Sequence, residues 1–180
     1  MKLCIDPGHG LLNASPRRYD PGAVRSPYEE ASIALDYALV LDEFARAAGI
    51  ETVLTRQKRD DPMPLGERVR KATAAGCEAF ISLHLNAAVS RDAHGTETLY
   101  KAAQGFAAIL QHAAVASIGL RDRGVKARPG LAVLQFPGPC ALVELGFITN
   151  DDDRSVLLSP RTQARFARAI VAALEEGEWK

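Results

Sequence analysis

The sequence predicts one α/β domain, residues 1–180, built on a twisted, largely parallel mixed sheet of about six strands with helices on both faces. Three observations support this fold class. Short apolar runs typical of buried strands alternate with longer segments whose apolar residues recur every three or four positions. The length of 180 residues suits a single domain. No internal repeat or low-complexity linker divides the sequence.

The expected strands are short and mostly apolar, and span residues 3–5, 51–55, 79–85, 96–100, 131–134 and 141–145. The expected helices span residues 31–48, 64–76 and 106–116, followed by a last helix that Ser159 caps and Pro160 begins. The acidic run 151–153 indicates a further helix start. Residues 7–28 contain seven Gly or Pro residues and predict one long loop, which in a compact domain is usually functional or mobile.

Composition excludes several classes of function. The 22 Lys and Arg residues balance the 22 Asp and Glu residues, which removes the electrostatic basis for a nucleic-acid partner. No apolar run approaches the roughly 18 residues of a membrane span. The odd set of Cys4, Cys77 and Cys140 contains no CxxC pair, which argues against a disulfide framework, and Cys4 and Cys140 are expected to be buried. We expect a monomer without nucleic-acid or membrane partners.

Residues that can bind a metal or transfer a proton lie at or just after the ends of three of the expected strands: His9, His84 and Glu144. Open α/β sheets bind ligands outside the carboxyl ends of their strands, and two imidazoles with a carboxylate are a common catalytic zinc set. The alternative is that the histidines are ordinary core or rim residues. Glu144 lies in an otherwise apolar strand, where a carboxylate is costly unless it binds metal or is paired, for example with an arginine.

Several short motifs, spread over essentially the whole chain, carry a family resemblance. They are Asp-Pro-Gly-His-Gly at 6–10, Asp-Pro-Gly-Ala at 20–23, Glu-Ala-Ser-Ile at 30–33, Thr-Arg at 55–56, Arg68, Phe-Ile-Ser-Leu-His-Leu-Asn-Ala at 80–87, Gly-Thr-Glu-Thr at 95–98 and Val-Glu-Leu-Gly-Phe-Ile-Thr-Asn at 143–150. With them the sequence resembles the zinc-dependent N-acetylmuramoyl-L-alanine amidases of the amidase-3 type, which cleave bacterial cell wall.

The resemblance implies a site and a role for each of its residues. One Zn²⁺ per chain would be held by His9, Glu30 and His84. Glu144 would act as general base and then as general acid. Asn86 would bind substrate, with a plain turn residue as the alternative.

Two adjacent acids compete for the third ligand position. The family pattern has the ligand acid followed by two small or polar residues and then an apolar one, which fits Glu30. One step along a helix turns a side chain by about 100°, so only one of the two acids can face the metal. Glu29 is the alternative ligand, and otherwise a first-turn acid favoured by the helix dipole.

The implied reaction is zinc-dependent hydrolysis of the amide between the lactyl group of N-acetylmuramic acid and L-alanine of the peptidoglycan stem peptide. Two alternatives stay open. One is a zinc peptidase of the stem peptide, and the other is a wall-binding module on the same fold that has lost turnover.

The resemblance also bears on where the protein acts. The sequence shows neither an export signal nor a wall-binding domain, and it begins with Met1. We therefore expect a lysin of phage type, made in the cytoplasm and acting on the wall, with the catalytic part of a larger secreted enzyme as the alternative. No helix that would plug the cleft is evident, so activity is expected to be constitutive.

Other polar residues are expected at the surface. His94 is expected in a solvated loop, or else lining the cleft, and His112 on an exposed helix flank. A row of arginines on the last helix predicts a solvated face, with contact to anionic wall polymers as the alternative: Arg161, Arg165 and Arg168.

Overall fold

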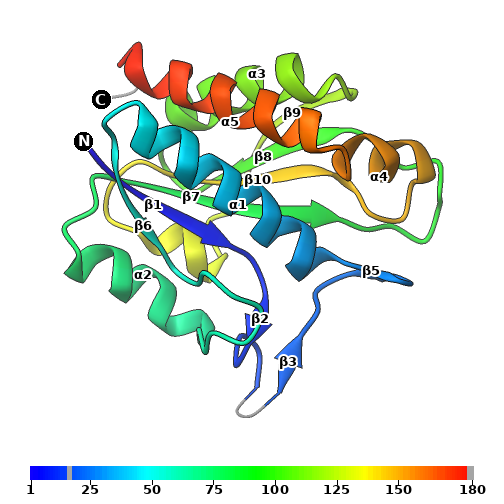
Figure 1. Ribbon diagram of the computed structural model, residues 1–180, viewed down its shortest axis with the longest axis horizontal. Coiled ribbons are helices and arrows are strands. Elements are labelled where there is room, and N and C mark those ends of the chain that lie inside the picture. Colours follow the sequence, from blue (N-terminus) through cyan, green and yellow to red (C-terminus); the bar gives the residue numbers. More distant parts are fainter. Residues whose placement is uncertain (16–17, 178–180) are drawn as a thin grey trace.

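A six-stranded mixed sheet forms the centre of the molecule in the computed structural model, which describes residues 1–15 and 18–177 (Figure 1). All neighbouring strands run parallel except β8, which is antiparallel to β10. This confirms the predicted fold class. The strand order is β6 (Glu51–Leu54), β1 (Lys2–Pro7), β7 (Ala79–Asn86), β10 (Cys140–Phe147), β8 (Thr96–Tyr100) and β9 (Asp122–Ala127).

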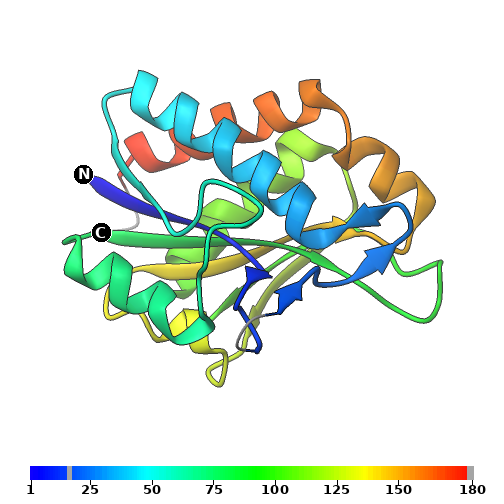
Figure 2. The same cartoon turned by 60° about the horizontal axis from the view of Figure 1, so that its bottom comes forward.

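Helices cover both faces of the sheet, but unequally (Figures 1 and 2). Three long helices pack on one face: α1 (Glu30–Ala47), α3 (Gln104–Ile118) and α5 (Pro160–Glu175). Within the described residues, the other face carries only α2 (Leu65–Ala74) and the short 3-10 helix η1 (Ala132–Gln135). The helix α4 (Asp151–Leu157) follows β10 and begins at the predicted acidic run. None of the helices in the described ranges is long and apolar enough to cross a membrane.

Each central strand contributes to two hydrophobic cores because successive side chains point to opposite faces. Leu3 and Ile5 belong to the large core beneath α1, α3 and α5, whereas Cys4 between them belongs to the smaller core beneath α2. Phe80 on β7 and Leu142 on β10 also face α2. Residues two or four positions further along these strands therefore point to the same, less covered face, and the polar site lies on that face.

Two predictions about local structure were wrong. Residues 131–134, predicted as a strand, contribute to η1 instead, and Leu134 N donates to Leu131 O three residues back. Short apolar runs are buried equally well by a strand or a helical turn, so the pattern did not distinguish them. Strand β9 was missed because it is a half-exposed edge strand of mostly polar residues, paired with β8.

The predicted loop 7–28 contains more order than expected, although its turns are where the Gly and Pro residues indicated. It contains one short antiparallel ribbon, formed by β2 (Gly10–Leu11) and β3 (Tyr19–Asp20). A second ribbon, formed by β4 (Val24–Arg25) and β5 (Tyr28–Glu29), extends one residue beyond the predicted end of the loop. Ser159 stands at the N-cap of α5, but its hydroxyl makes no capping hydrogen bond. Cys4 and Cys140 are buried, as predicted.

Candidate metal centre

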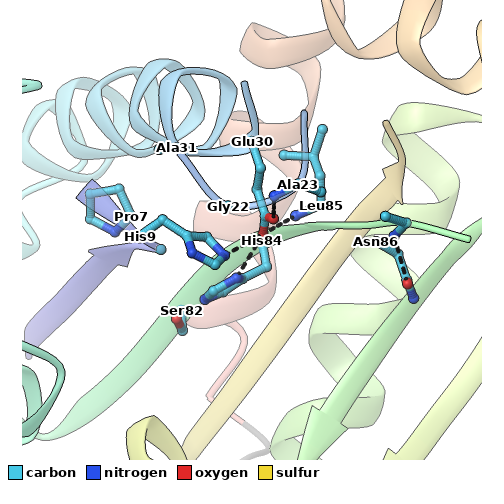
Figure 3. A network of polar contacts seen from close by, with 12 residues as sticks. Pro7, His9, Gly22, Ala23, Glu30, Ala31, Ser82, His84, Leu85 and Asn86 are labelled. Carbon is cyan, nitrogen blue, oxygen red and sulfur yellow. Dashed lines mark hydrogen bonds and ion pairs between the residues drawn. The ribbon is translucent and has the colours of Figure 1, made fainter. Parts of the chain in front are cut away.

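Three side chains from distant parts of the sequence meet at the carboxyl ends of β1 and β7 (Figure 3). His9 Nε2 lies 3.0 Å from Glu30 Oε1, and His84 Nδ1 lies 2.8 Å from the same oxygen. One nitrogen or oxygen from each of the three lies within 4.8 Å of the other two. Two imidazole nitrogens and one carboxylate oxygen are donors that Zn²⁺ takes in proteins, and these three lie close enough together to hold a metal ion.

Each of the three residues is placed by the end of a secondary-structure element. His9 follows β1, His84 is near the end of β7, and Glu30 is the first residue of α1. The Glu30 carboxylate is also fixed by backbone amides, because Leu85 N donates to Oε1 at 3.0 Å and Ala23 N donates to Oε2 at 2.8 Å. Burial alone would raise the pKa of Glu30, but the contacts with His84 and His9 hold it well below its usual range.

Glycines allow this close approach of chain segments. A Cβ on Gly8 would lie 2.3 Å from His84 Cε1, inside the imidazole ring's own space. A Cβ on Gly22, which has a φ of +69°, would lie 2.6 Å from Glu30 Oε2. His9 itself has a φ of +59°, a left-handed conformation that non-glycine residues adopt rarely and often at functional sites.

Asp20 orients His9 from the side opposite to Glu30. His9 Nδ1 lies 2.8 Å from Asp20 Oδ2, which also accepts from Asn13 Nδ2 at 2.7 Å, while Gly22 N donates to Asp20 Oδ1 at 2.9 Å. This contact leaves His9 Nε2 free to face Glu30, in the way that a carboxylate orients a metal-binding histidine. Burial opposes the charged imidazole, but Glu30 and Asp20 outweigh it and raise the pKa of His9. Asp20 was not predicted to have a role.

A buried ion pair supports the loop beneath the histidines. Arg68 Nη1 donates to Asp6 Oδ1 at 2.6 Å, and Arg68 Nη2 donates to the carbonyl of His9. Thr55 Oγ1 and Ser82 Oγ also donate to the Asp6 carboxylate. Burial would raise the pKa of Asp6, but Arg68 and the two hydroxyls outweigh it, so that pKa lies below its usual range.

The second buried arginine joins the same loop to α1. Arg56 Nε donates to Pro7 O at 3.1 Å, and Arg56 Nη2 donates to Gly8 O at 2.8 Å and Ala31 O at 2.7 Å. The strand end that carries His9 is thereby held against the helix that carries Glu30. Arg56 and Arg68 matched the resemblance motifs, but no role for either was predicted.

The neighbouring acid, Glu29, lies outside this group of donors. Its Oε2 accepts from Tyr19 Oη at 3.0 Å and lies 3.4 Å from Arg59 Nη2. The two acids at the start of α1 thus point in different directions, and Glu30 is the one that meets the histidines.

Glu144 stands beside this group on the next strand. It pairs with His84 in the parallel register of β10 and β7, and its Oε2 is buried without a partner among residues 1–15 and 18–177. No arginine pairs with Glu144 in that part of the chain, so the alternative of a structural ion pair with an arginine is not observed. Burial raises the pKa of Glu144 to about 7, and the nearby acids Glu30 and Glu97 act in the same direction.

Asn86 ends β7 and turns toward β8 rather than toward the histidines. Its Nδ2 donates to Glu97 Oε1 at 3.2 Å, and its Oδ1 accepts from Ala87 N at 2.8 Å. His94 is partly exposed in a loop, where its Nδ1 lies 2.7 Å from Asp92 O. His112 is exposed, as are the arginines of the α5 row, which are Arg161, Arg165 and Arg168.

The fold and the site together place the protein among the α/β domains that carry a candidate metal-ligand set at the carboxyl ends of their strands. The comparison with known families is more specific. Residues 3–176 match the family Amidase_3, described as N-acetylmuramoyl-L-alanine amidase, and the chain belongs to this family of enzymes.

Named relatives agree with the family. The N-acetylmuramoyl-L-alanine amidase LytC of Bacillus subtilis is 35% identical over 174 residues, which are 93% of this chain and 34% of LytC. The amidase CwlM of Mycobacterium tuberculosis is 30% identical over 97% of this chain and 44% of CwlM. The chain therefore spans about a third of LytC and less than half of CwlM.

Solved structures show the same fold. The catalytic domain of the amidase CwlV from Bacillus (Paenibacillus) polymyxa superposes with a TM-score of 0.87 and 29% identity, covering 97% of this chain and 96% of that domain. The structure of the amidase AmiC2 of Nostoc punctiforme gives a TM-score of 0.86 with 26% identity, over 98% of this chain and 96% of the chain in that structure.

Proposed function

We propose that this chain is a zinc-dependent N-acetylmuramoyl-L-alanine amidase that cleaves the amide between the lactyl group of N-acetylmuramic acid and L-alanine of the peptidoglycan stem peptide. The observation that carries the proposal is the convergence of His9, Glu30 and His84 beside an unpartnered carboxylate on Glu144. Family membership supports the same reaction and the wall substrate.

His9 Nε2, Glu30 and His84 Nδ1 would hold one Zn²⁺ per chain. When bound, the ion supplies Lewis-acid polarisation of the scissile carbonyl and lowers the pKa of water toward about 7. Asp20 keeps the Nδ1 side of His9 occupied, so that only Nε2 is offered to the ion. The backbone amides of Ala23 and Leu85 limit how far the Glu30 carboxylate can turn.

Glu144 carries the proton transfers. Its unpartnered Oε2 accepts a proton from the attacking water and then returns it to the amide nitrogen, which leaves poorly unless it is protonated. A pKa raised to about 7 suits a group that must take up and release a proton in one cycle near neutral pH. The register that pairs Glu144 with His84 on the neighbouring strand supports this role.

The face of the sheet around the site leaves room for a substrate. A cavity of about 200 Å³ borders both His9 and His84, and apolar side chains from α2, η1 and β10 contribute to its walls. They are Leu65, Val133 and Leu142. Residues 1–180 would act as one catalytic domain, monomeric, on the cell wall. Asn86 would contact substrate with the donor capacity that Glu97 leaves unused.

Fragment analysis of digested cell wall tests this function. Purified protein should release stem peptides with a free L-alanine amino group and glycan strands without peptide, and both are identified by mass spectrometry. Fragments in which L-alanine stays attached to the sugar would show a peptidase instead. Binding of wall without any release of amino groups would show a non-catalytic module, and either result would overturn the proposal.

A further inference from the structure

A cluster of three charged side chains, separate from the candidate metal ligands, lies on β8 and β9. In the strand order, Glu144 on β10 lies between this cluster and His84 on β7. Glu97 on β8 pairs with Glu144 in antiparallel register and is 6% exposed. Its Oε2 accepts from Arg123 Nε at 2.7 Å and from Lys126 Nζ. Both cations lie on β9, so Glu97 joins the candidate catalytic strand to the edge of the sheet.

The cations of this group outnumber the acids with which they pair. Arg123 and Lys126 share one oxygen of a single carboxylate, and no other acid in the described ranges pairs with either. Arg123 Nη1 donates to His94 O, and the guanidinium carbon lies 4.8 Å from the centre of the Phe147 ring. The hydrogen bonds of Arg123 within residues 1–15 and 18–177 use Nε and Nη1 and leave Nη2 without a partner. Lys126 Nζ has one acceptor there and therefore has spare donors.

Both side chains are held in place yet reachable from solvent. The Arg123 side chain is 27% exposed and that of Lys126 is 33% exposed. The Glu97 contacts and the Phe147 ring restrict their rotamers, so less side-chain entropy is lost when an anion binds. A half-buried, preorganised Arg–Lys pair with free donors is suited to a carboxylate.

Distance along the sheet indicates which part of the substrate reaches these cations. Neighbouring strands lie about 4.8 Å apart, and β9 is the second strand from β10. The side chains of Arg123 and Lys126 reach back to Glu97 on β8, so their charged ends are about one to two strand spacings from Glu144. A peptide residue spans about 3.5 Å, so a group on the second residue beyond the cut amide covers that distance. The N-acetylated sugar has no negative charge to pair with the two cations, whereas the stem peptide carries carboxylates.

We propose that Arg123 and Lys126, held by Glu97, form a subsite for the carboxylate on the second residue of the peptide leaving group. The proposal rests on the amidase function proposed above and assigns the direction in which the peptide lies, from Glu144 toward β9. Arg123 and Lys126 touch substrate in this account, and Glu97 is a positioning residue.

The test uses two soluble muramoyl peptides that differ only in whether the carboxyl group on the second residue is free or an amide. The wild type should show a KM several-fold lower for the free carboxylate, with similar kcat for both. Arg123→Gln and Lys126→Met should each abolish that preference by raising KM for the free carboxylate alone. Arg128→Gln, one residue beyond the end of β9, should keep it, and so should Lys101→Met.

Binding of the peptides without sugar provides a readout that needs no turnover. Calorimetry should show tighter binding of the peptide with the free second-residue carboxylate, and loss of that difference in Arg123→Gln or Lys126→Met. A peptide amidated only at its chain terminus should bind like the unmodified one. Should Arg123→Gln fail to fold, judged by thermal unfolding, Lys126→Met decides.

Equal KM values for the two substrates in the wild type, or a preference unchanged in both variants, would overturn the subsite. Failure of the wild type to cleave either substrate would contradict the amidase function instead, and the binding measurement would then decide the subsite by itself.

Discussion

Glu144 and His84 occupy paired positions on the neighbouring parallel strands β10 and β7, and both point to the face of the sheet that α2 and η1 cover. Parallel register brings the carboxylate and the imidazole side by side although 59 residues separate them in sequence (144 minus 84, less one). The proposed proton-transfer group and the candidate ligand are thus placed by sheet geometry rather than by flexible loops.

Replacing Glu144 tests the division of roles between these two side chains. Glu144→Gln keeps shape and removes the base, so kcat should fall by about 10²–10⁴-fold. Zinc content should be unchanged because Glu144 is not among the three grouped donors. Amino groups released from purified wall measure the rate, and elemental analysis measures the metal. A variant with full zinc and full activity would remove Glu144 from the mechanism.

The contact between Asp20 and His9 should control metal affinity without supplying a ligand. In Asp20→Asn the imidazole loses a charged partner, and the Kd for zinc should rise by about 10–100-fold. Competition with a chromophoric chelator gives the affinity. Asp60→Asn, an exposed site, is the matched control. An unchanged Kd in Asp20→Asn would mean that His9 is oriented by its backbone alone.

The close approach of Gly8 to His84 predicts a steric effect confined to the site. Gly8→Ala places a methyl group in the imidazole ring's space, so zinc binding should be lost or greatly weakened. Gly66→Ala in α2, where the added Cβ meets only a flexible arginine tip at 3.7 Å, should bind zinc normally and unfold at an equal or higher temperature. Normal zinc affinity in Gly8→Ala would contradict the geometry.

The Asp6–Arg68 pair predicts the acid side of the stability curve. The native pKa of Asp6 is lower than its unfolded value of 3.8, so the unfolded chain binds more protons in acid. This contribution is fully present well above pH 3.8 and is lost as the pH falls through that value toward the lowered native pKa. Urea unfolding at a series of pH values measures it.

Asp6→Asn provides the comparison for that curve. Removing one partner of a buried pair should cost about 3–5 kcal/mol at pH 7, because Arg68 is left buried without its counter-ion. The loss of stability below about pH 5 should be shallower than in the wild type, since one depressed carboxyl is absent. Parallel curves for the two proteins would show that Asp6 does not set the acid limit.

Particular residues show how far the sequence alone could predict the site. His9, His84 and Glu144 were found because strand ends are visible in the hydrophobic pattern and parallel strands align their carboxyl ends. Glu30 could not be found that way, since an acid at a helix start is favoured by the helix dipole whether or not it binds anything. The family resemblance, not spacing, singled it out.

Other features depended on tertiary contacts that no local pattern encodes. Asp20 contacts His9 through one hydrogen bond made across the ribbon of β2 and β3. Glu97 contacts cations on β9, and the sequence of that strand is too polar to be recognised as a strand. The apolar side chains Val133 and Leu134 fill the core beneath α2 from a helical turn. A strand would have buried them equally well, so the apolar pattern did not distinguish the two.

Zinc content of two paired variants tests the central claim most directly. We predict one zinc per chain, by elemental analysis, in the wild type and in Glu29→Gln, and little or none in Glu30→Gln. The reason is that Glu30 meets both imidazoles while Glu29 contacts Tyr19 and Arg59. Full zinc in Glu30→Gln, or its loss in Glu29→Gln from a chain that still folds, would contradict the account.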